Sequence, residues 1–404
     1  MRRLVPLLPL LLAASPAPVQ QPAAMPATAQ GVPDAGTVLL TSDAEDRWVP
    51  FQLTPGNQIR FSMLLDGHSL TAILDTGVSF SVLARRSPAF DAAKARAGGN
   101  ASAIGGSVAI SWMPTHSMVV GGLTRTGGGI SVAELPATAT GGGPAVDLLI
   151  GRDLLGGQAL DIDYAAHRFR LIHSGRMPFR GAVAPLWISP ERRVYESELT
   201  LGGQRLRPMV VDTGDGSPIT VASKGWASAG LSALPTTTAL VFGLAGPVVS
   251  GLAVVPSLSI GELKAQSVEV RIEPGDGFST SIGTAGRIGS GFLQNYRVLL
   301  DPPAGRMVLS PGPGADKPPL RSTTGILAGL LPDRIRVLHV MKNSPAEQGG
   351  WKDGDTICSI NGVAITASYA TSPLARWSIA PAGTVVRLGL CDGTIRPLTT
   401  RAFY

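Results

Sequence analysis

The apolar and polar positions of the chain predict many short β-strands. Residues 62–75 and 197–212 each contain two strand-compatible runs that flank a turn pair, Asp66-Gly67 in the first stretch and Gly202-Gly203 in the second. Such pairs are typical of β-hairpin turns. Between residues 46 and 311 no long stretch has the 3.6-residue apolar period of a helix, and short helical turns are expected only at 152–155 and 291–295. The pattern therefore predicts a mainly β fold.

Composition limits the classes of protein that the chain can belong to. Of its 404 residues 44% are hydrophobic and 15% charged, which provides for buried cores and argues against global disorder. The formal charge is +6, but no run of more than three basic residues occurs, so a nucleic-acid partner is not expected. The two cysteines are too few for a disulfide scaffold and lack the CxxC spacing of a zinc site.

The first 45 residues have the pattern of a targeting segment. Arg2 and Arg3 precede an apolar run from Leu4 to Ala14, followed by small residues and Pro. This pattern predicts a signal peptide over residues 1–20 and a flexible leader over 21–45. The apolar run is too short to cross a bilayer, which takes roughly 20 helical residues. We expect an exported protein, secreted or periplasmic, that is not an integral membrane protein after signal removal.

An internal repeat organises the middle of the chain. Ile73-Leu74-Asp75-Thr76-Gly77 is matched by Val210-Val211-Asp212-Thr213-Gly214, with the two aspartates 137 positions apart. Further along, Ile150-Gly151 is matched by Ile288-Gly289 at an offset of 138. Fixed-offset similarity of this kind indicates repeated structural units. We expect two related lobes, residues 46–180 and 181–311.

Each repeated aspartate stands at the end of an apolar strand and is followed by Thr and Gly. A pseudo-twofold axis between the lobes would bring the loops of Asp75 and Asp212 face to face. Two carboxyls a few ångströms apart share one proton, because both cannot ionise cheaply. One then serves as a general base toward water and the other as an acid toward a carbonyl oxygen. This chemistry hydrolyses an amide and needs neither a metal nor a cofactor.

At these motifs the chain resembles the retropepsin-like aspartic proteases, with both halves fused in one polypeptide as in pepsin. The resemblance covers residues 46–311 and implies two pseudo-twofold-related β lobes that hydrolyse peptides or unfolded proteins. It implies that Asp75 and Asp212 are the catalytic pair. It also implies loop-supporting roles for the residues around them: Thr76, Gly77, Thr213, Gly214, Ile150, Gly151, Ile288 and Gly289.

The motifs depart from the family pattern in several places. Arg287 precedes Ile288 where an apolar residue is common, and Val78-Ser79 and Asp215-Gly216 follow the two loop glycines where other residues are usual. Asp215 adds a third acid, whose negative charge is expected to raise the affinity of the pair for protons. Glycine-tipped flap hairpins are expected around Gly105-Gly106 and 243–246, although no Tyr marks either one. These departures leave open a second reading, a catalytically silent envelope protein that binds peptides.

The pattern changes after a Pro/Gly-rich linker at residues 312–320. The string NSPAEQGGWKDGDTICSING begins at Asn343 and resembles the PDZ domain in its bacterial, strand-permuted form. The resemblance covers residues 321–404 and implies binding of an extended peptide, often a C-terminus, by strand addition. The loop of Thr324, Gly325, Ile326 and Leu327 would then offer backbone N–H groups to a carboxylate. Cys358 and Cys391 lie on expected strands of this domain and could be bridged or could be two small core residues.

Other hydrolase classes lack their residues. The histidines form no HExxH zinc motif, and no Gly-Asp-Ser-Gly-Gly string marks a serine nucleophile. We expect no metal and no cofactor, and a monomeric protein.

Overall fold

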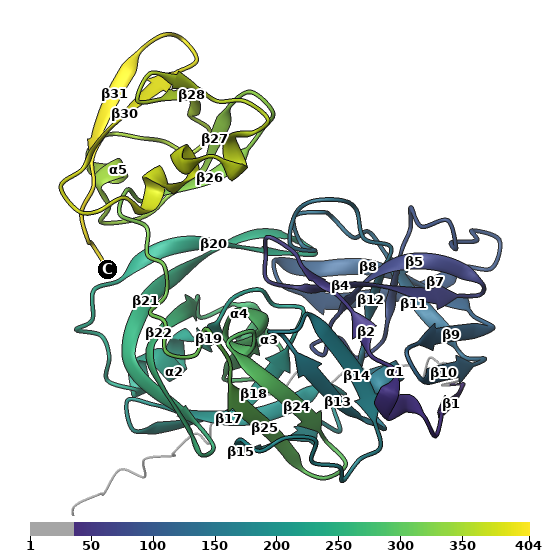
Figure 1. Cartoon of the computed structure of the whole chain (residues 1–404). Coiled ribbons are helices and arrows are strands. Elements are labelled where there is room, and N and C mark those ends of the chain that lie inside the picture. The colour runs from purple at the N-terminus through teal and green to yellow at the C-terminus, as the bar shows by residue number, and fades with distance from the viewer. Residues whose placement is uncertain (1–35) are drawn as a thin grey trace, which may run out of the picture. The chain divides into compact units, whose positions relative to one another are not determined.

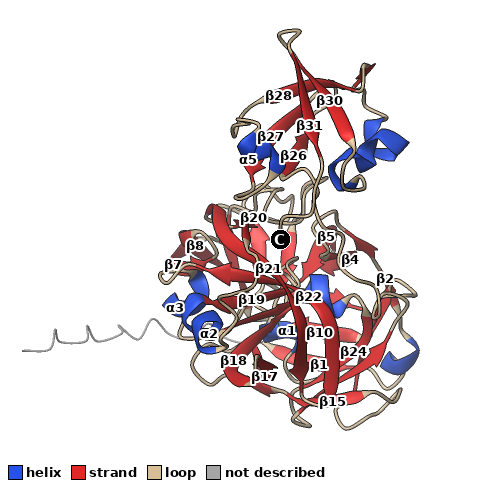
Figure 2. Ribbon diagram, turned by 90° about the vertical axis from the view of Figure 1, so that its left-hand side faces the viewer, coloured by secondary structure: helices blue, strands red, loops and turns tan. Residues whose placement is uncertain are grey.

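The computed structural model of the protein describes residues 36–404. The predicted signal peptide and residues 21–35 of the predicted leader lie outside the described residues. Strands make up most of the regular structure and the helices are short, so the mainly β prediction is confirmed (Figures 1 and 2). The predicted helical turns are present as α1, Arg152–Leu155, and α4, Ser290–Leu293.

The first sheet has eleven strands. In spatial order ten of them run β1-β10-β9-β4-β5-β12-β6-β11-β8-β7, and β3 pairs with β4. Their bounds are Thr37–Leu40 (β1), Gln52–Leu53 (β3), Ile59–Leu65 (β4), His68–Leu74 (β5), Val82–Ala84 (β6), Arg96–Ala103 (β7), Gly106–Pro114 (β8), Ser117–Val120 (β9), Leu123–Thr126 (β10), Gly129–Ala133 (β11) and Leu148–Ile150 (β12).

Strand β1 corrects the predicted extent of the leader. The leader was expected to continue to residue 45, but β1 pairs antiparallel with β10, and the short helix η1 covers Ala44–Asp46. Val38 and Leu40 pack against the main hydrophobic core. Alternate apolar residues therefore draw this segment into the sheet.

The second repeat forms an eight-stranded sheet in the order β16-β17-β18-β23-β19-β22-β21-β20. An additional pairing of β17 with β21 connects distant parts of this order. The bounds are Trp187–Ile188 (β16), Tyr195–Leu201 (β17), Gln204–Asp212 (β18), Ile219–Ala222 (β19), Thr237–Gly243 (β20), Gly246–Ile260 (β21), Leu263–Glu273 (β22) and Gly286–Gly289 (β23). Two helices accompany this sheet, α2 at Ser223–Ser228 and α3 at Phe278–Ser281.

The two sheets share one pairing pattern. The order β4-β5-β12-β6-β11-β8-β7 in the first equals β17-β18-β23-β19-β22-β21-β20 in the second. The strand directions agree as well, because β12 lies parallel to β5 and β23 lies parallel to β18. In register, Ile150 faces Leu74 as Ile288 faces Val211. The sequence repeat is therefore also a repeat of strand pairing.

A six-stranded sheet joins the two copies in the order β15-β25-β24-β13-β14-β2. Its centre is the antiparallel pairing of β13 with β24, one strand from each repeat. The bounds are Val49–Pro50 (β2), Ala159–Asp163 (β13), Arg168–Ile172 (β14), Ala182–Pro185 (β15), Tyr296–Asp301 (β24) and Arg306–Pro311 (β25). One hydrophobic core extends through both repeats, from Val49 to Leu309.

The C-terminal segment has its own sheet and core. Its strands run β26-β27-β28-β30-β31, with β29 paired to β28, and its core is separate from the main one. The bounds are Ile326–Leu330 (β26), Ile335–Val340 (β27), Thr356–Ile360 (β28), Val363–Ala364 (β29), Val385–Leu390 (β30) and Ile395–Thr399 (β31). The helices are α5, Pro345–Gln348, and the 3-10 helices η2, Tyr369–Thr371, and η3, Pro373–Ile379. Ser344 caps α5, its hydroxyl accepting from the Glu347 N–H.

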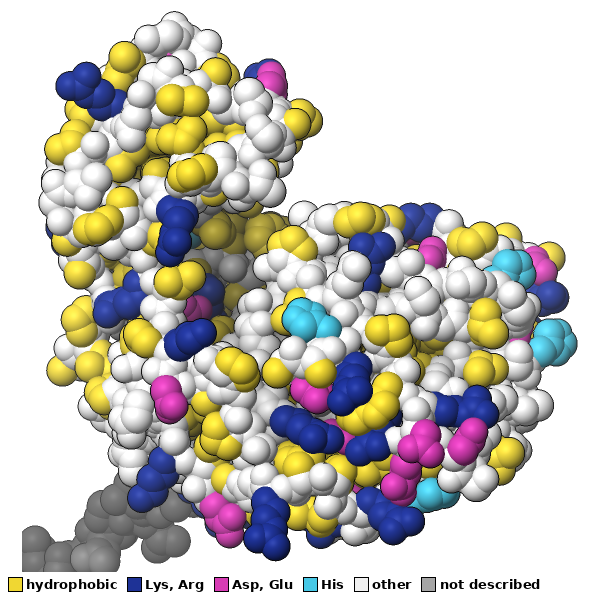
Figure 3. Space-filling model, in the orientation of Figure 1, with side chains coloured by type: hydrophobic (Ala, Val, Ile, Leu, Met, Phe, Trp, Pro, Cys, Tyr) yellow, Lys and Arg dark blue, Asp and Glu magenta, His cyan; other side chains and the backbone are white. Residues whose placement is uncertain are grey.

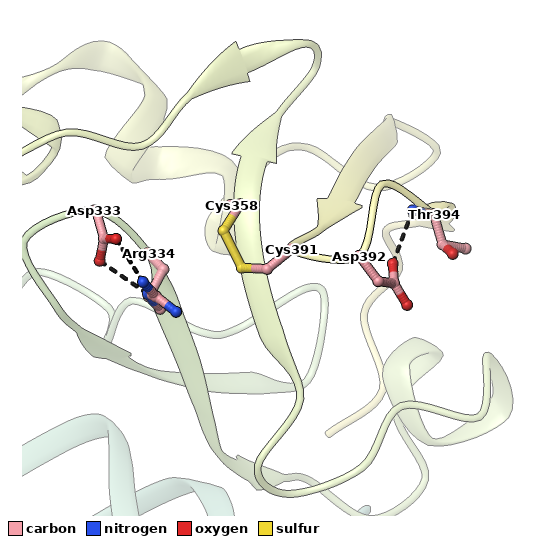
Figure 4. The surroundings of a disulfide bond; sticks show 6 residues. All are labelled: Asp333, Arg334, Cys358, Cys391, Asp392 and Thr394. Atoms are coloured by element: carbon pink, nitrogen blue, oxygen red, sulfur yellow. Dashed lines mark hydrogen bonds and ion pairs between the residues drawn. A yellow bond between two sulfur atoms is a disulfide. The ribbon is translucent and has the colours of Figure 1, made fainter.

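The two cysteines form a disulfide. Cys358 on β28 and Cys391, directly after β30, are bridged, as Figure 4 shows. The sequence left this pairing open. The bridge ties two neighbouring strands of the C-terminal sheet together.

On the face drawn in Figure 3, Lys and Arg side chains are scattered among acidic and uncharged ones and form no single stripe. Among residues 36–404 no helix is long and apolar enough to cross a membrane.

Candidate functional site

Asp75 and Asp212 meet at the centre of the two repeats. Asp75 directly follows β5 and Asp212 ends β18, and each carboxyl lies against the glycine of the opposite loop. Both residues are buried, with 9% and 7% of their surface exposed. The Asp75 carboxylate accepts from the Gly77 N–H at 3.0 Å, and the Asp212 carboxylate accepts from the Gly214 N–H at 3.0 Å. Both loops make this bond, and the Asp212 carboxylate accepts a further one from the Asp215 N–H at 3.0 Å.

Each loop glycine makes room for the carboxyl of the opposite loop. A Cβ on Gly77 would lie 2.4 Å from the Asp212 Cγ, and one on Gly214 would lie 2.3 Å from the Asp75 Cγ. No real Cβ fits at these distances. Glycine is therefore required at both positions by the approach of the two carboxyls.

Thr76 and Thr213 interlock beneath the aspartates. Each hydroxyl accepts from the other threonine's N–H at 3.0 Å. Each also donates to a carbonyl in the opposite repeat, Thr76 to Val211 at 2.6 Å and Thr213 to Leu74 at 2.8 Å. Both threonines are fully buried. The four bonds fix the two loops relative to each other.

The Ile-Gly segments lie under the loops. The Asp75 N–H donates to the Ile150 carbonyl at 2.9 Å, and Ile150 and Ile288 are fully buried. A Cβ on Gly289 would lie 2.1 Å from the Ser217 carbonyl, and one on Gly151 would lie 2.8 Å from the Val78 carbonyl. All ten of the residues predicted for this site therefore gather at one place.

A buried ion-pair network beside Asp212 was not predicted. Arg287, whose side chain is 1% exposed, pairs with Asp215 at 2.8 Å and with Glu273 at 2.7 Å. Its Nε also lies 4.0 Å from the Asp212 carboxylate. In the first sheet the register places Leu149 at the position of Arg287. The sequence did carry a signal for this network. Where the first repeat has the apolar Leu149 and Val78, the second has the cation Arg287 and the anion Asp215.

The pKa values of both aspartates are raised. Burial, followed by the negative charge of Asp212, raises the pKa of Asp75 well above its ordinary value. Burial also raises the pKa of Asp212, to about 6; the negative charge of Asp215 adds to the rise, while Arg287 opposes it. The expected effect of Asp215 therefore has the right sign, and Arg287 partly offsets it.

A cavity of about 540 Å³ opens at the two carboxyls. Its lining includes Asp75, Asp212 and the apolar Ile73 and Leu149. The predicted glycine-tipped segments are both hairpins, β7–β8 and β20–β21, and residues 101–104 and 240–244 also line the cavity. Among residues 36–404 no cluster of His, Cys, Asp and Glu could hold a metal ion.

The residues predicted for carboxylate binding lie at the start of β26. The Gly325 N–H donates to the Ser322 hydroxyl at 2.9 Å, and the Ile326 N–H donates to the Thr324 hydroxyl at 3.4 Å. Thr324 is fully buried, Ile326 is buried and Leu327 is half-buried. Two of the loop's N–H groups are therefore already engaged by side-chain hydroxyls.

No protein-family model and no curated protein matches this sequence. The geometry of the described residues therefore carries the functional argument.

Proposed function

We propose that the protein is an exported aspartic-type endopeptidase of the retropepsin-like kind, with two related lobes and a C-terminal PDZ domain. The observation that carries the proposal is the meeting of Asp75 and Asp212 in one buried site at the end of matched strands. The cavity at these carboxyls has the volume of a typical ligand pocket. The substrate would be a peptide or an unfolded segment of a protein.

The surroundings of the pair favour different roles for its two carboxyls. The pKa of Asp75 is raised by burial and by Asp212, and no cation lies beside it among the contacts described. Asp212 has the Arg287 guanidinium 4.0 Å away, which favours its ionised form. Asp75 would therefore hold the shared proton and donate it toward the substrate carbonyl, while the Asp212 carboxylate activates water.

The C-terminal domain would bind an extended peptide along β26. This strand stands at one end of the sheet order, with β27 as its only neighbour among the pairings of residues 36–404. An edge strand of this kind offers unpaired backbone groups to a further strand. We place the domain at residues 321–404, and we propose that the chain acts as a monomer.

A second candidate function is peptide binding without hydrolysis. The observation that favours it is the Arg287 network, because a cation near Asp212 lowers the proton affinity of that carboxyl and weakens the sharing of one proton. In this case the protein would bind peptides at β26, and the two lobes would not hydrolyse them.

Hydrolysis of a peptide library distinguishes the two candidates. The wild type should cleave peptides, and Asp75→Asn and Asp212→Asn should each abolish cleavage while remaining folded. Asp276→Asn, an identical change at an exposed aspartate, is the control and should cleave like the wild type. Wild-type protein that binds peptides but cleaves none from acidic to neutral pH would favour the silent alternative.

A further inference from the structure

The tips of two hairpins meet beside the cavity. The Ala245 N–H, between β20 and β21, donates to the Ile104 carbonyl, between β7 and β8, at 3.2 Å. A Cβ on Gly243 would lie 2.0 Å from the same carbonyl. Because residues of both tips line the cavity, separation of the tips would widen the way into it.

The other end of β20 is held by the C-terminal domain. Thr237 donates its hydroxyl to the Lys342 carbonyl at 2.6 Å. The Thr238 hydroxyl accepts from the Lys342 N–H at 3.1 Å and hydrogen-bonds the His339 Nε2 at 2.7 Å. One hydroxyl therefore makes two bonds across this contact. Asn343 adds a bond from its side-chain amide to the Thr236 carbonyl at 3.1 Å.

Apolar side chains complete the contact. Ala239 on β20 and Leu252 on β21 form a small core with Met341 and Tyr404 of the C-terminal domain. All four are buried. We call the contact of Thr237, Thr238 and Ala239 with this domain the brace.

The hairpin can transmit a displacement from the brace to the tip. Strands β20 and β21 pair without a register shift from Thr237–Leu252 to Gly243–Gly246. At about 3.3 Å per residue, the braced Ala239 lies roughly 13 Å along the strand from Gly243. A regularly paired ribbon of this length moves largely as one body, so the position of its base influences its tip.

We propose that the C-terminal domain regulates access to the cavity by bracing the β20–β21 hairpin. This inference rests on the proposed function for its biological meaning, since the gated site is the aspartate pair. The brace lies close to the proposed peptide strand: His339 on β27 is in register with Leu327 on β26. The brace therefore lies one strand away from β26, the edge strand at which the C-terminal domain would bind its peptide.

The test is amide hydrogen exchange of residues 243–246 in the full chain. Thr238→Val removes the hydroxyl and both of its bonds, and the tip amides should exchange about tenfold faster, which corresponds to about 1.4 kcal/mol. Thr238→Ser keeps the hydroxyl and should restore wild-type exchange. Thr366→Val makes the same substitution at an exposed site of the C-terminal domain, away from the brace, and is the matched control.

Activity provides a second readout that separates the two proposals. If the wild type cleaves peptides, Thr238→Val should raise KM severalfold and leave the pH dependence of kcat unchanged. If the wild type cleaves nothing, the proposed function fails, and the exchange experiment alone decides the brace. Equal tip exchange in wild type and Thr238→Val, with both folded, would overturn the inference, as would an equal change in Thr366→Val.

Discussion

Replacing Arg287 with Leu tests whether the buried carboxylates of Asp215 and Glu273 need this cation for the stability of the fold. The variant gives β23 the residue type that the first sheet has at Leu149. It leaves Asp215 and Glu273, which are 5% and 6% exposed, without their shared cation. Two carboxylates would then be buried close together with no positive partner.

The expected loss of stability is large. Removing one partner of a buried ion pair costs about 3–5 kcal/mol, because the remaining charge has lost both its hydration and its partner. The loss of Arg287 should also raise the pKa of Asp212 further, since Arg287 lowers it in the wild type. Under the proposed function, the acidic limb of the pH–rate profile should therefore move to higher pH.

The assay is urea unfolding at pH 7 of the wild type, Arg287→Leu and a triple variant. The triple variant, Arg287→Leu with Asp215→Val and Glu273→Ala, removes every charge of the network. Replacing all members of a buried ion network with apolar residues is often neutral or stabilising.

The triple variant gives the second sheet the residues that the first sheet has at the same positions. Leu149, Val78 and Ala133 of the first sheet correspond to Arg287, Asp215 and Glu273, in that order. We expect the single variant to lose about 3–5 kcal/mol and the triple variant to recover most of that loss. A single variant as stable as the wild type would show that Asp215 and Glu273 do not depend on Arg287 for their burial.

Three further predictions follow from the site and the C-terminal domain. Gly77→Ala should abolish hydrolysis and lower the unfolding free energy, measured by urea titration, because its Cβ would lie 2.4 Å from the Asp212 Cγ. Cys358→Ser with Cys391→Ser should destabilise the C-terminal domain by about 3–4 kcal/mol, measured by hydrogen exchange of its strands, because the bridge closes a loop of 33 positions; unchanged exchange would contradict this. The raised pKa of Asp212, about 6 against 3.8, means that the folded state holds a proton which the unfolded chain releases. Stability should therefore fall by up to about 3 kcal/mol as pH rises from 4 to 6, and Asp75→Asn with Asp212→Asn should remove this slope in urea unfolding; an unaltered slope would contradict the assignment.

Local patterns predicted the parts of the fold that depend on neighbouring residues. The turn pairs at Asp66-Gly67 and Gly202-Gly203 lie in hairpins, and the short helices after Gly151 and Gly289 are where they were expected. The repeated Asp-Thr-Gly loop showed that Asp75 and Asp212 hold equivalent positions in the two repeats. These features could be predicted because turn chemistry and repetition are visible along the chain.

The features that were missed depend on long-range register. Arg287, Asp215 and Glu273 lie on β23, the second loop and β22, and they meet only because β19 pairs parallel to β22 and antiparallel to β23. Likewise, β1 is ordered by pairing with β10, which lies more than eighty residues away. Neither contact can be read from neighbouring residues. Arg287, at the position where the first repeat has Leu149, was the one sign that the ion-pair network is unusual.

The sharing of one proton is measured most directly by a carboxyl titration of the wild type, with ¹³Cγ-labelled aspartate observed by NMR. The pair should show two linked ionisations, both above the ordinary aspartate range, with the signals of Asp75 and Asp212 each responding to both steps. In Asp212→Asn the Asp75 signal should titrate in a single step. Two independent ionisations near pH 3.8 in the wild type, unaffected by the substitution, would show that Asp75 and Asp212 share no proton.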